Sequence, residues 1–342
     1  PEGGGQACDL GRLGEASVLD VQEKDGVVFH LCDKPLPVDE IAEGVIDWER
    51  RFDLMQQHSG EHIVSGIVHS MLGHHNVGFH VGSDRMEIDF DGPVSPEDLQ
   101  IIETRANEAV WANLPIRCWY PSEEELPNVA YRTKKALPWP VRIVQIPGYD
   151  TCACCGVHVK TTGQIGLVKL FSCVKFHQGV RIEMACGARA LAFLSKVYEQ
   201  NRQVSQAFSA KLMETGEAAR KMNEALAAEK YRGVSLQKQL FGYTAEQYRG
   251  KRFALHFEEG LSPAGVRELA EIISGVCDGT AAVFSGGDSR FDVCLANSGG
   301  DIKELGNRMA KALDGRGGGK PGFFQGSVRA TKEQIVAFFQ SI

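Results

Sequence analysis

The chain has 342 residues, 43% of them hydrophobic and 24% charged, so it predicts roughly two or three folded domains of ordinary globular composition. Its net charge of −7 excludes a broadly cationic nucleic-acid-binding surface but allows local basic patches. No apolar run approaches the roughly 18 residues of a transmembrane helix, and no secretory signal is apparent, so we expect no membrane segment.

Ten cysteines are scattered along the chain without the spacing of a small disulfide scaffold. We therefore expect buried or metal-bound thiols in a reducing, cytoplasmic compartment. The chain starts at Pro1 and not at a methionine, so we also expect its natural beginning to lie upstream.

Residues 1–47 predict a small β-rich segment, interpreted as part of a β-barrel. After an N-terminal glycine run, strands are expected over 16–21 and 26–32, joined by a turn at Asp25 and Gly26.

Residues 48–187 predict an α+β domain with a mixed sheet. A long helix over 48–72 carries an apolar face that includes Leu54, Ile63 and Ile67. A second helix begins at the N-cap residue Ser95 and runs to about residue 113. Strands are expected over 77–80, 86–90, 116–120, 141–146, 157–160, 165–172 and 180–185.

Beyond residue 187 the sequence pattern changes twice. Residues 188–245 keep apolar side chains at three- and four-residue steps, which is typical of a helical hairpin or coiled coil, with a break near Gly216 or Gly233. Residues 246–342 predict a separate, small α/β domain. Its expected strands span 253–257, 280–285 and 291–296, its helices span 263–276, 302–313 and a segment from 331 onward, and a glycine loop spans 315–322.

Two residue pairs have the spacing of metal ligands. His58 and His62 are four apart on the expected long helix, so their imidazoles share one helix face. Cys154 and His158 repeat this spacing further along the chain. Three imidazoles and one thiolate suit the tetrahedral nitrogen and sulfur preference of Zn²⁺, so we predict one zinc ion per chain.

Other residues compete for this site, namely His74, His75, His80, Cys152 and Cys155. Four protein ligands would make a closed structural site, whereas three ligands plus water would make a catalytic one, and the spacing does not decide between them.

A metalloprotease is the alternative that the first pair suggests. His58, Glu61 and His62 match the H-x-x-E-H signature, in which the glutamate acts as general base. This signature needs a downstream carboxylate as third ligand, and Glu103 or Glu108 on the next helix would supply it. The interpretation leaves the second residue pair unexplained.

Four motifs in a fixed order resemble the editing domain of alanyl-tRNA synthetase and the free-standing AlaX editing proteins. They are Pro1-Glu2-Gly3-Gly4-Gly5-Gln6, the segment from Met55 to His62, Val77-Gly78-Phe79-His80, and Cys154-Cys155-Gly156-Val157-His158, followed by Thr162-Gly163-Gln164-Ile165-Gly166. The glycine-rich stretch from Gly317 to Gly326 is similar to the C-terminal, DHHA1-type domain of the same synthetase. The resemblance covers nearly the whole chain.

This resemblance implies a long-form AlaX protein that hydrolyses the aminoacyl ester of mischarged tRNA(Ala), chiefly Ser-tRNA(Ala) and also Gly-tRNA(Ala). It implies that His58, His62, Cys154 and His158 bind zinc, and that Gln6 lies near the active site. It also implies that Ser59, in place of the family's usual threonine, contacts the serine hydroxyl of the substrate. Ser59, Cys155 and Val157 depart from the usual pattern and bear on substrate preference.

Further expectations follow from this editing function. Glu61 is a candidate water-activating base or an orienter of the neighbouring ligand. Basic and glycine residues are expected to bind RNA: Arg132, Lys134, Lys135, Arg316, Gly318, Gly319 and Lys320. We also expect a homodimer through the helical and C-terminal regions. A non-catalytic tRNA-binding zinc protein remains the second alternative.

Overall fold

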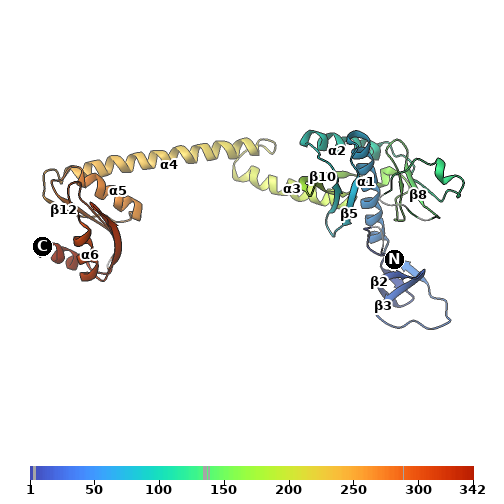
Figure 1. Cartoon of the computed structure of the whole chain (residues 1–342), viewed down its shortest axis with the longest axis horizontal. Helices are drawn as coiled ribbons and strands as arrows, with labels where there is room; N and C mark the ends of the chain where they lie inside the picture. The colour runs from blue at the N-terminus through green and yellow to red at the C-terminus, as the bar shows by residue number, and fades with distance from the viewer. Residues whose placement is uncertain (3–4, 134–136, 138, 288) are drawn as a thin grey trace. The chain divides into compact units, whose positions relative to one another are not determined.

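The computed structural model describes residues 1–2, 5–133, 137, 139–287 and 289–342. Contacts within the chain divide it into two compact units, Pro1–Leu212 and Met213–Ile342, each with a hydrophobic core of its own (Figure 1). Among the described residues, no helix combines the length and the apolar character needed to cross a membrane.

The first unit begins with a four-stranded antiparallel sheet in the order β3-β2-β1-β4. Its strands are β1 (Gly11–Leu13), β2 (Ala16–Lys24), β3 (Val27–Cys32) and β4 (Gly44–Ile46). The predicted hairpin is confirmed, because Asp25 and Gly26 have φ values of 55° and 77°, as a two-residue turn requires. The sheet has a small core of Cys8, Val18 and Val21, and its closure into a barrel stays a prediction.

Helix α1 (Trp48–Leu72) has the predicted bounds. Asp47 caps its start by accepting a hydrogen bond from the backbone N–H of Arg50, and Gly73 ends it in the left-handed conformation. Side chains are buried almost continuously from Leu54 to Val68, so the helix is covered on more than the single apolar face expected. Buried polar residues on such a helix need partners from the surrounding elements.

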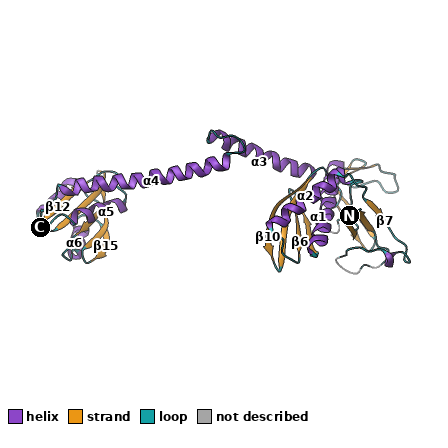
Figure 2. Ribbon diagram, turned by 90° about the horizontal axis from the view of Figure 1, so that it is seen from above, coloured by secondary structure: helices purple, strands orange, loops and turns teal. Residues whose placement is uncertain are grey.

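Two antiparallel sheets lie on either side of α1, as Figures 1 and 2 both show. One has the order β10-β11-β6-β5 and comprises β5 (Asn76–Val81), β6 (Met86–Phe90), β10 (Val168–Phe176) and β11 (Gly179–Cys186). The other has the order β7-β8-β9 and comprises β7 (Arg117–Trp119), β8 (Ile143–Ile146) and β9 (Asp150–Ala153). Helix α1 is thus the central element of an α+β unit, which confirms the expected class.

Helix α2 (Pro96–Trp111) begins with a capping box between Ser95 and Asp98, in agreement with the predicted N-cap. It contributes Ile102 to a core in which Ile63 and Ile88 are also fully buried. Each such side chain stabilises the fold by about 1.5–3 kcal/mol through burial. This core holds α1 rigidly against the sheets.

The strand predicted over 157–160 is wrong. That segment forms no ladder, and a short 3₁₀ helix, η2 (Thr162–Ile165), follows it. Its backbone groups are bonded singly instead: the N–H of Ile116 donates to the carbonyl of Lys160, and the N–H of Val159 donates to Ser59 Oγ. β9 (Asp150–Ala153), which ends just before Cys154, was not expected as a strand.

The predicted helical stretch contains α3 (Gly187–Ala207) in the first unit and α4 (Thr215–Glu246) in the second. The helices are interrupted just before Gly216, which confirms one of the two predicted positions of the break. Gly233, the other predicted position, lies inside α4. The division into segments 1–47, 48–187, 188–245 and 246–342 stays a prediction, since the boundary between the two compact units falls after Leu212.

The second unit contains one five-stranded sheet in the order β12-β13-β14-β16-β15. Its strands are β12 (Phe253–Phe257), β13 (Thr280–Gly287), β14 (Arg290–Ala296), β15 (Arg316–Lys320) and β16 (Phe323–Val328). Helix α5 (Pro263–Ser274) covers one face, and α6 (Lys303–Ala312) and α7 (Lys332–Gln340) cover the other.

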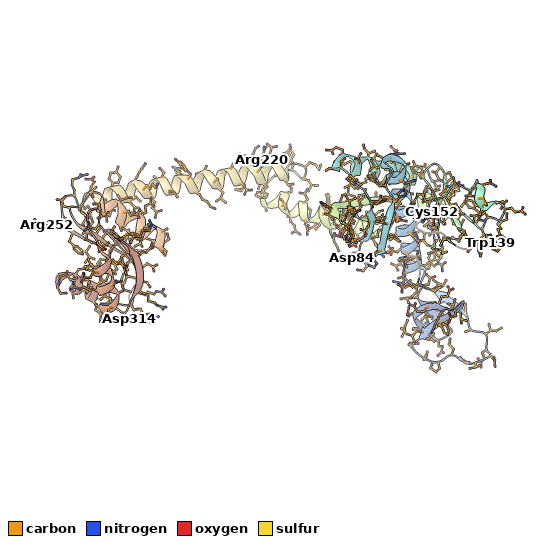
Figure 3. All side chains as sticks on the ribbon, in the orientation of Figure 1. Asp84, Trp139, Cys152, Arg220, Arg252 and Asp314 are labelled. Atoms are coloured by element: carbon orange, nitrogen blue, oxygen red, sulfur yellow. The ribbon has the colours of Figure 1, made fainter. Side chains whose placement is uncertain are left out.

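The glycine loop predicted over 315–322 is wrong for most of its length, because residues 316–320 form the edge strand β15. A side chain at Gly317 would collide with Phe324 and with the carbonyl oxygen of Gln325. The glycines therefore permit close strand pairing, which local composition does not reveal. Asp314, labelled in Figure 3, precedes this strand.

Candidate metal centre

The first ligand pair lies in the buried middle of α1. His58 and His62 are only 3% and 2% exposed, and their ring centroids lie 5.3 Å apart. Gly60, between them, faces Cys186 so closely that a side chain there would collide with its sulfur. This contact with the end of β11 fixes the position of α1 at the turn that carries the two histidines.

The second pair lies in the loop after β9, beside α1. Arg142 holds this loop, because its Nη1 donates to the carbonyl oxygens of Cys154 and Gly156, at 2.8 and 2.9 Å. The Gly156 N–H also lies 3.3 Å from Cys154 Sγ. A side chain at Gly156 would collide with the imidazole of His58, so glycine is required for the loop to approach the helix.

The two pairs converge on one point. The ligand atoms of His58, His62, Cys154 and His158 all lie within 4.8 Å of one another. Cys154 Sγ lies 3.4 Å from His58 Nε2, and the His158 ring lies 4.7 Å from each of the other two imidazoles, measured between centroids. The predicted cluster of four is therefore present.

The hydrogen bonds of the imidazoles indicate a metal site. Each imidazole has a different partner at Nδ1: Gln6 Oε1 at 2.7 Å for His58, Asp150 Oδ2 at 2.8 Å for His62, and Ser59 Oγ at 3.4 Å for His158. The Nε2 atom of His158 is buried without a hydrogen-bond partner among the described residues. Nδ1 atoms held by oxygen partners orient Nε2 for a metal, so the residues present fit a metal ion.

The electrostatics of the cluster favour the ligand form of its thiol. Burial raises the pKa of Cys154, but its close contacts with the imidazoles of His158, His58 and His62 outweigh burial and lower it to about 2. Burial lowers the pKa of His158 to about 3, and the Cys154 contact does not offset it. A thiolate and a neutral imidazole are the forms that bind a metal ion.

His62 is held by a carboxylate that sequence analysis missed. Asp150, at the start of β9, is 1% exposed at its side chain and also accepts from Arg132 Nε and Nη2, at 2.8 and 2.9 Å. Burial raises the pKa of Asp150, but the hydrogen bonds from His62 and Arg132 lower it below its usual range. The chain from Arg132 through Asp150 to His62 resembles the carboxylate–histidine pairs that orient metal ligands.

Glu61 is also buried beside the cluster. Its Oε1 accepts hydrogen bonds from Ser65 Oγ, at 2.6 Å, and from Asn76 Nδ2, while its Oε2 lies 4.0 Å from His62 Nε2. The carboxylate is therefore fixed through one oxygen and directs the other toward the ligands. Neither Ser65 nor Asn76 was expected to take part.

Ser59 lies deeper than sequence analysis expected. Its side chain is fully buried, and its hydroxyl accepts from the backbone N–H of Val159, at 3.1 Å, besides contacting His158. This position favours orientation of His158 over contact with a substrate. The predicted contact with a serine hydroxyl stays a prediction.

The competing ligands do not join the cluster of four. Among the described residues, a second group of metal-ligating side chains comprises His62, Asp150 and Cys152, and Figure 3 labels Cys152 near α1. Burial raises the pKa of Cys152 to about 11, which keeps it a thiol. The third, carboxylate ligand that the protease needs is absent from both groups: Glu103 accepts hydrogen bonds from Lys169 and from the N–H of Leu170, and Glu108 is exposed.

The predicted RNA-binding residues occupy two places. Arg132 borders the metal centre through Asp150, whereas Lys134 and Lys135 lie outside the described residues. In the second unit, Arg316, Gly318, Gly319 and Lys320 all lie on β15 and are exposed.

Comparison with known proteins places this site in a class. Residues 141–183, which include Cys154 and His158, match the family described as "Threonyl and Alanyl tRNA synthetase second additional domain". Part of the site therefore lies in a segment that is similar to this domain.

The alanyl-tRNA editing protein Aarsd1-A of Xenopus laevis is 32% identical over 98% of this chain and 83% of its own length. Aarsd1 of Mus musculus is 29% identical over 100% and 85%. The chain therefore belongs to the family of alanyl-tRNA editing proteins, and the AlaX-like interpretation is confirmed.

Two further similarities are more limited. The alanine–tRNA ligase of Thermofilum pendens is 29% identical over 97% of this chain but over only 39% of its own length. The C-Ala domain of Aquifex aeolicus alanyl-tRNA synthetase covers 27% of this chain and 93% of its own, at 21% identity and a TM-score of 0.24, a value too low to bear on the fold.

Proposed function

We propose that this chain is a zinc-dependent hydrolase that deacylates mischarged Ser-tRNA(Ala), and also Gly-tRNA(Ala), by cleaving the aminoacyl ester. Membership of the alanyl-tRNA editing family supports action on tRNA. The observation that carries the zinc dependence is the convergence of His58, His62, Cys154 and His158, with all three Nδ1 atoms held by oxygen partners.

The donor set fits zinc better than harder divalent ions, because imidazole and thiolate are borderline and soft ligands. When bound, zinc would polarise the ester carbonyl, activate a water or anchor the amino group of the aminoacyl moiety. Four simultaneous protein ligands favour the anchoring or structural role.

The chain's own residues supply the remaining chemistry. Glu61 is our candidate for accepting a proton from the attacking water, since its Oε2 lies beside the ligands while Ser65 and Asn76 hold its Oε1. An ester is more reactive than an amide, so an oriented water and stabilisation of the developing oxyanion are sufficient. Gln6 orients the imidazole of His58 through its contact with Nδ1, the ring nitrogen that does not face the cluster.

Selection against alanine cannot rest on size, because serine is the larger side chain. A site that hydrogen-bonds the serine hydroxyl rejects alanine, because a buried polar group of the site is then left unpaired. In our proposal, Ser59 acts by orienting His158. Direct contact of Ser59 with the substrate is the alternative, and mutation of Ser59 distinguishes the two roles.

RNA binding is proposed for Arg132 in the first unit and for β15 in the second. Gly318 supports this role, because no atom of another described residue lies within 4 Å of the place its side chain would occupy, and its φ does not require glycine. A glycine that neither packing nor φ requires is typical of close approach by a ligand. Arg316 and Lys320 flank it. A homodimer through residues 188–342 is also proposed.

The deciding experiment compares deacylation of Ser-tRNA(Ala) and Ala-tRNA(Ala) by zinc-loaded protein. We expect hydrolysis of the first and not of the second, and loss of activity in His58→Ala and Cys154→Ala. Cys118→Ala is the control, because this thiol is exposed and outside the cluster. A folded, zinc-loaded protein that binds tRNA without hydrolysing either ester would support the non-catalytic alternative.

A further inference from the structure

A cleft of about 460 Å³ opens in the first unit beside the metal centre. It lies between the second half of α1, where Gly66 and His69 face it, and the turn from β8 to β9, which contributes Tyr149 and Asp150. Tyr131 and Arg132 complete its walls. Its volume is typical of a small-ligand site, and the metal ligands are not part of its lining.

The cleft continues the metal centre along one face of α1. Gly66 and His69 are four and seven residues beyond His62, so they share its face, and His69 lies about 10 Å further along the helix axis. Asp150 joins the two places, because it lines the cleft and also accepts the hydrogen bond from His62. A ligand that reaches the metal centre with one end has room in the cleft for its adjoining part.

The walls are fixed by close packing and ion pairing. A side chain at Gly66 would collide with the carbonyl oxygen of Tyr149, so the turn rests directly on the helix. Gly148 has a φ of 77°, which shapes that turn. Arg132 is held by two hydrogen bonds to Asp150 through Nε and Nη2, and its Nη1 makes no hydrogen bond to the described residues.

The chemistry of the lining matches a nucleotide. Tyr131 and Tyr149 offer aromatic rings of the kind on which bases stack, and Arg132 offers a guanidinium of the kind that binds phosphate. The one carboxylate in the lining, Asp150, is paired with Arg132 and His62 and so presents little free negative charge.

We propose that this cleft binds the nucleotide that precedes the terminal adenosine of the acceptor strand. Its base stacks on the tyrosine rings, and its phosphate binds Arg132. This inference rests on the proposed function, which puts the terminal aminoacyl-adenosine at the metal centre. In this proposal, the metal centre recognises the aminoacyl-adenosine that reacts, and the cleft recognises the nucleotide that precedes it.

Two substrates of different length test the cleft in the full chain. For Tyr131→Ala we expect the KM for Ser-tRNA(Ala) to rise about ten-fold or more, with kcat unchanged, since one stacked base is lost. The KM for 3′-O-seryl-adenosine, which has no preceding nucleotide, should not change. Tyr131→Phe should restore the KM, and Tyr120→Ala is the control, because Tyr120 is 63% exposed and outside the lining.

An equal change of KM for both substrates, or a change for neither, would overturn the proposal. Binding of uncharged CpCpA and of adenosine, followed by NMR, separates this proposal from the deacylase proposal. If neither ester is hydrolysed, tighter binding of CpCpA than of adenosine that is lost in Tyr131→Ala still supports the cleft. Equal binding of the two probes refutes it even in an active deacylase. Thermal unfolding of each variant verifies that it is folded.

Discussion

Replacing Asp150 by Asn tests how His62 is held. The substitution keeps the size of the side chain but removes the charge that pairs with Arg132 and His62. Asp150 is 1% exposed and Arg132 is 18% exposed, so water compensates little for the lost pair. We therefore expect two separate effects, one on the stability of the metal-free protein and one on metal affinity.

The stability effect follows from burial. Removing one partner of a buried ion pair costs about 3–5 kcal/mol, because the other charge stays buried without compensation. The affinity effect follows from orientation: loss of the carboxylate behind a histidine ligand weakens metal binding about 10- to 100-fold. That factor corresponds to about 1.4–2.7 kcal/mol.

Urea unfolding of the metal-free protein measures the first effect, and zinc titration against a competing chelator measures the second. Asp89→Asn is the matched control, because Asp89 makes the same two-pronged contact with Arg181, at 2.7 and 2.9 Å, away from the metal centre. It should lower stability less, since both partners are more exposed, and leave zinc affinity unchanged. Equal zinc affinities of wild type and Asp150→Asn would refute the orienting role.

Four further substitutions give distinct outcomes. Gly156→Ala should weaken zinc binding at least about ten-fold by displacing His58, as measured by chelator competition. Gly233→Ala, inside an exposed helix, should instead raise the free energy of unfolding by about 0.5–1 kcal/mol, as measured by urea unfolding. Ser59→Ala should cost about 1–3 kcal/mol of stability yet keep the preference for Ser-tRNA(Ala), and loss of that preference would show direct substrate contact. Burial raises the pKa of Cys294 to about 12 from an ordinary 9.0, so between these pH values the thiol is ionised only in the unfolded state. The contribution of this thiol to stability is therefore complete below pH 9 and is lost as the pH rises from 9 to about 12. The stability difference between wild type and Cys294→Ala should therefore shrink by about 1.4 kcal/mol per pH unit above pH 9, and a constant difference in urea unfolding would contradict this.

The sequence predicts what local periodicity encodes. The bounds of α1, the N-cap at Ser95 and the spacing of His58 and His62 follow from helical repeat and capping, which involve neighbours along the chain. The four ligands could be assembled because each pair carries its own spacing.

The remaining features depend on contacts between distant segments. Asp150 meets His62 across 88 positions of the sequence, and no local pattern marks it as a partner. Glu61 was visible from the motif, but its fixation by Asn76 requires β5 to lie beside α1. The edge strand of the second unit was mistaken for a loop, because glycine signals both turns and close strand contacts, and only the packing of Phe324 distinguishes them.

The claim central to this account is that His58, His62, Cys154 and His158 bind one zinc ion together. X-ray absorption spectroscopy of protein loaded with one equivalent of zinc tests it most directly. We predict three nitrogen ligands at about 2.0–2.1 Å and one sulfur ligand at about 2.3 Å, with the sulfur lost in Cys154→Ala. A first shell of oxygen atoms, or a sulfur contribution that survives in Cys154→Ala, would contradict the account.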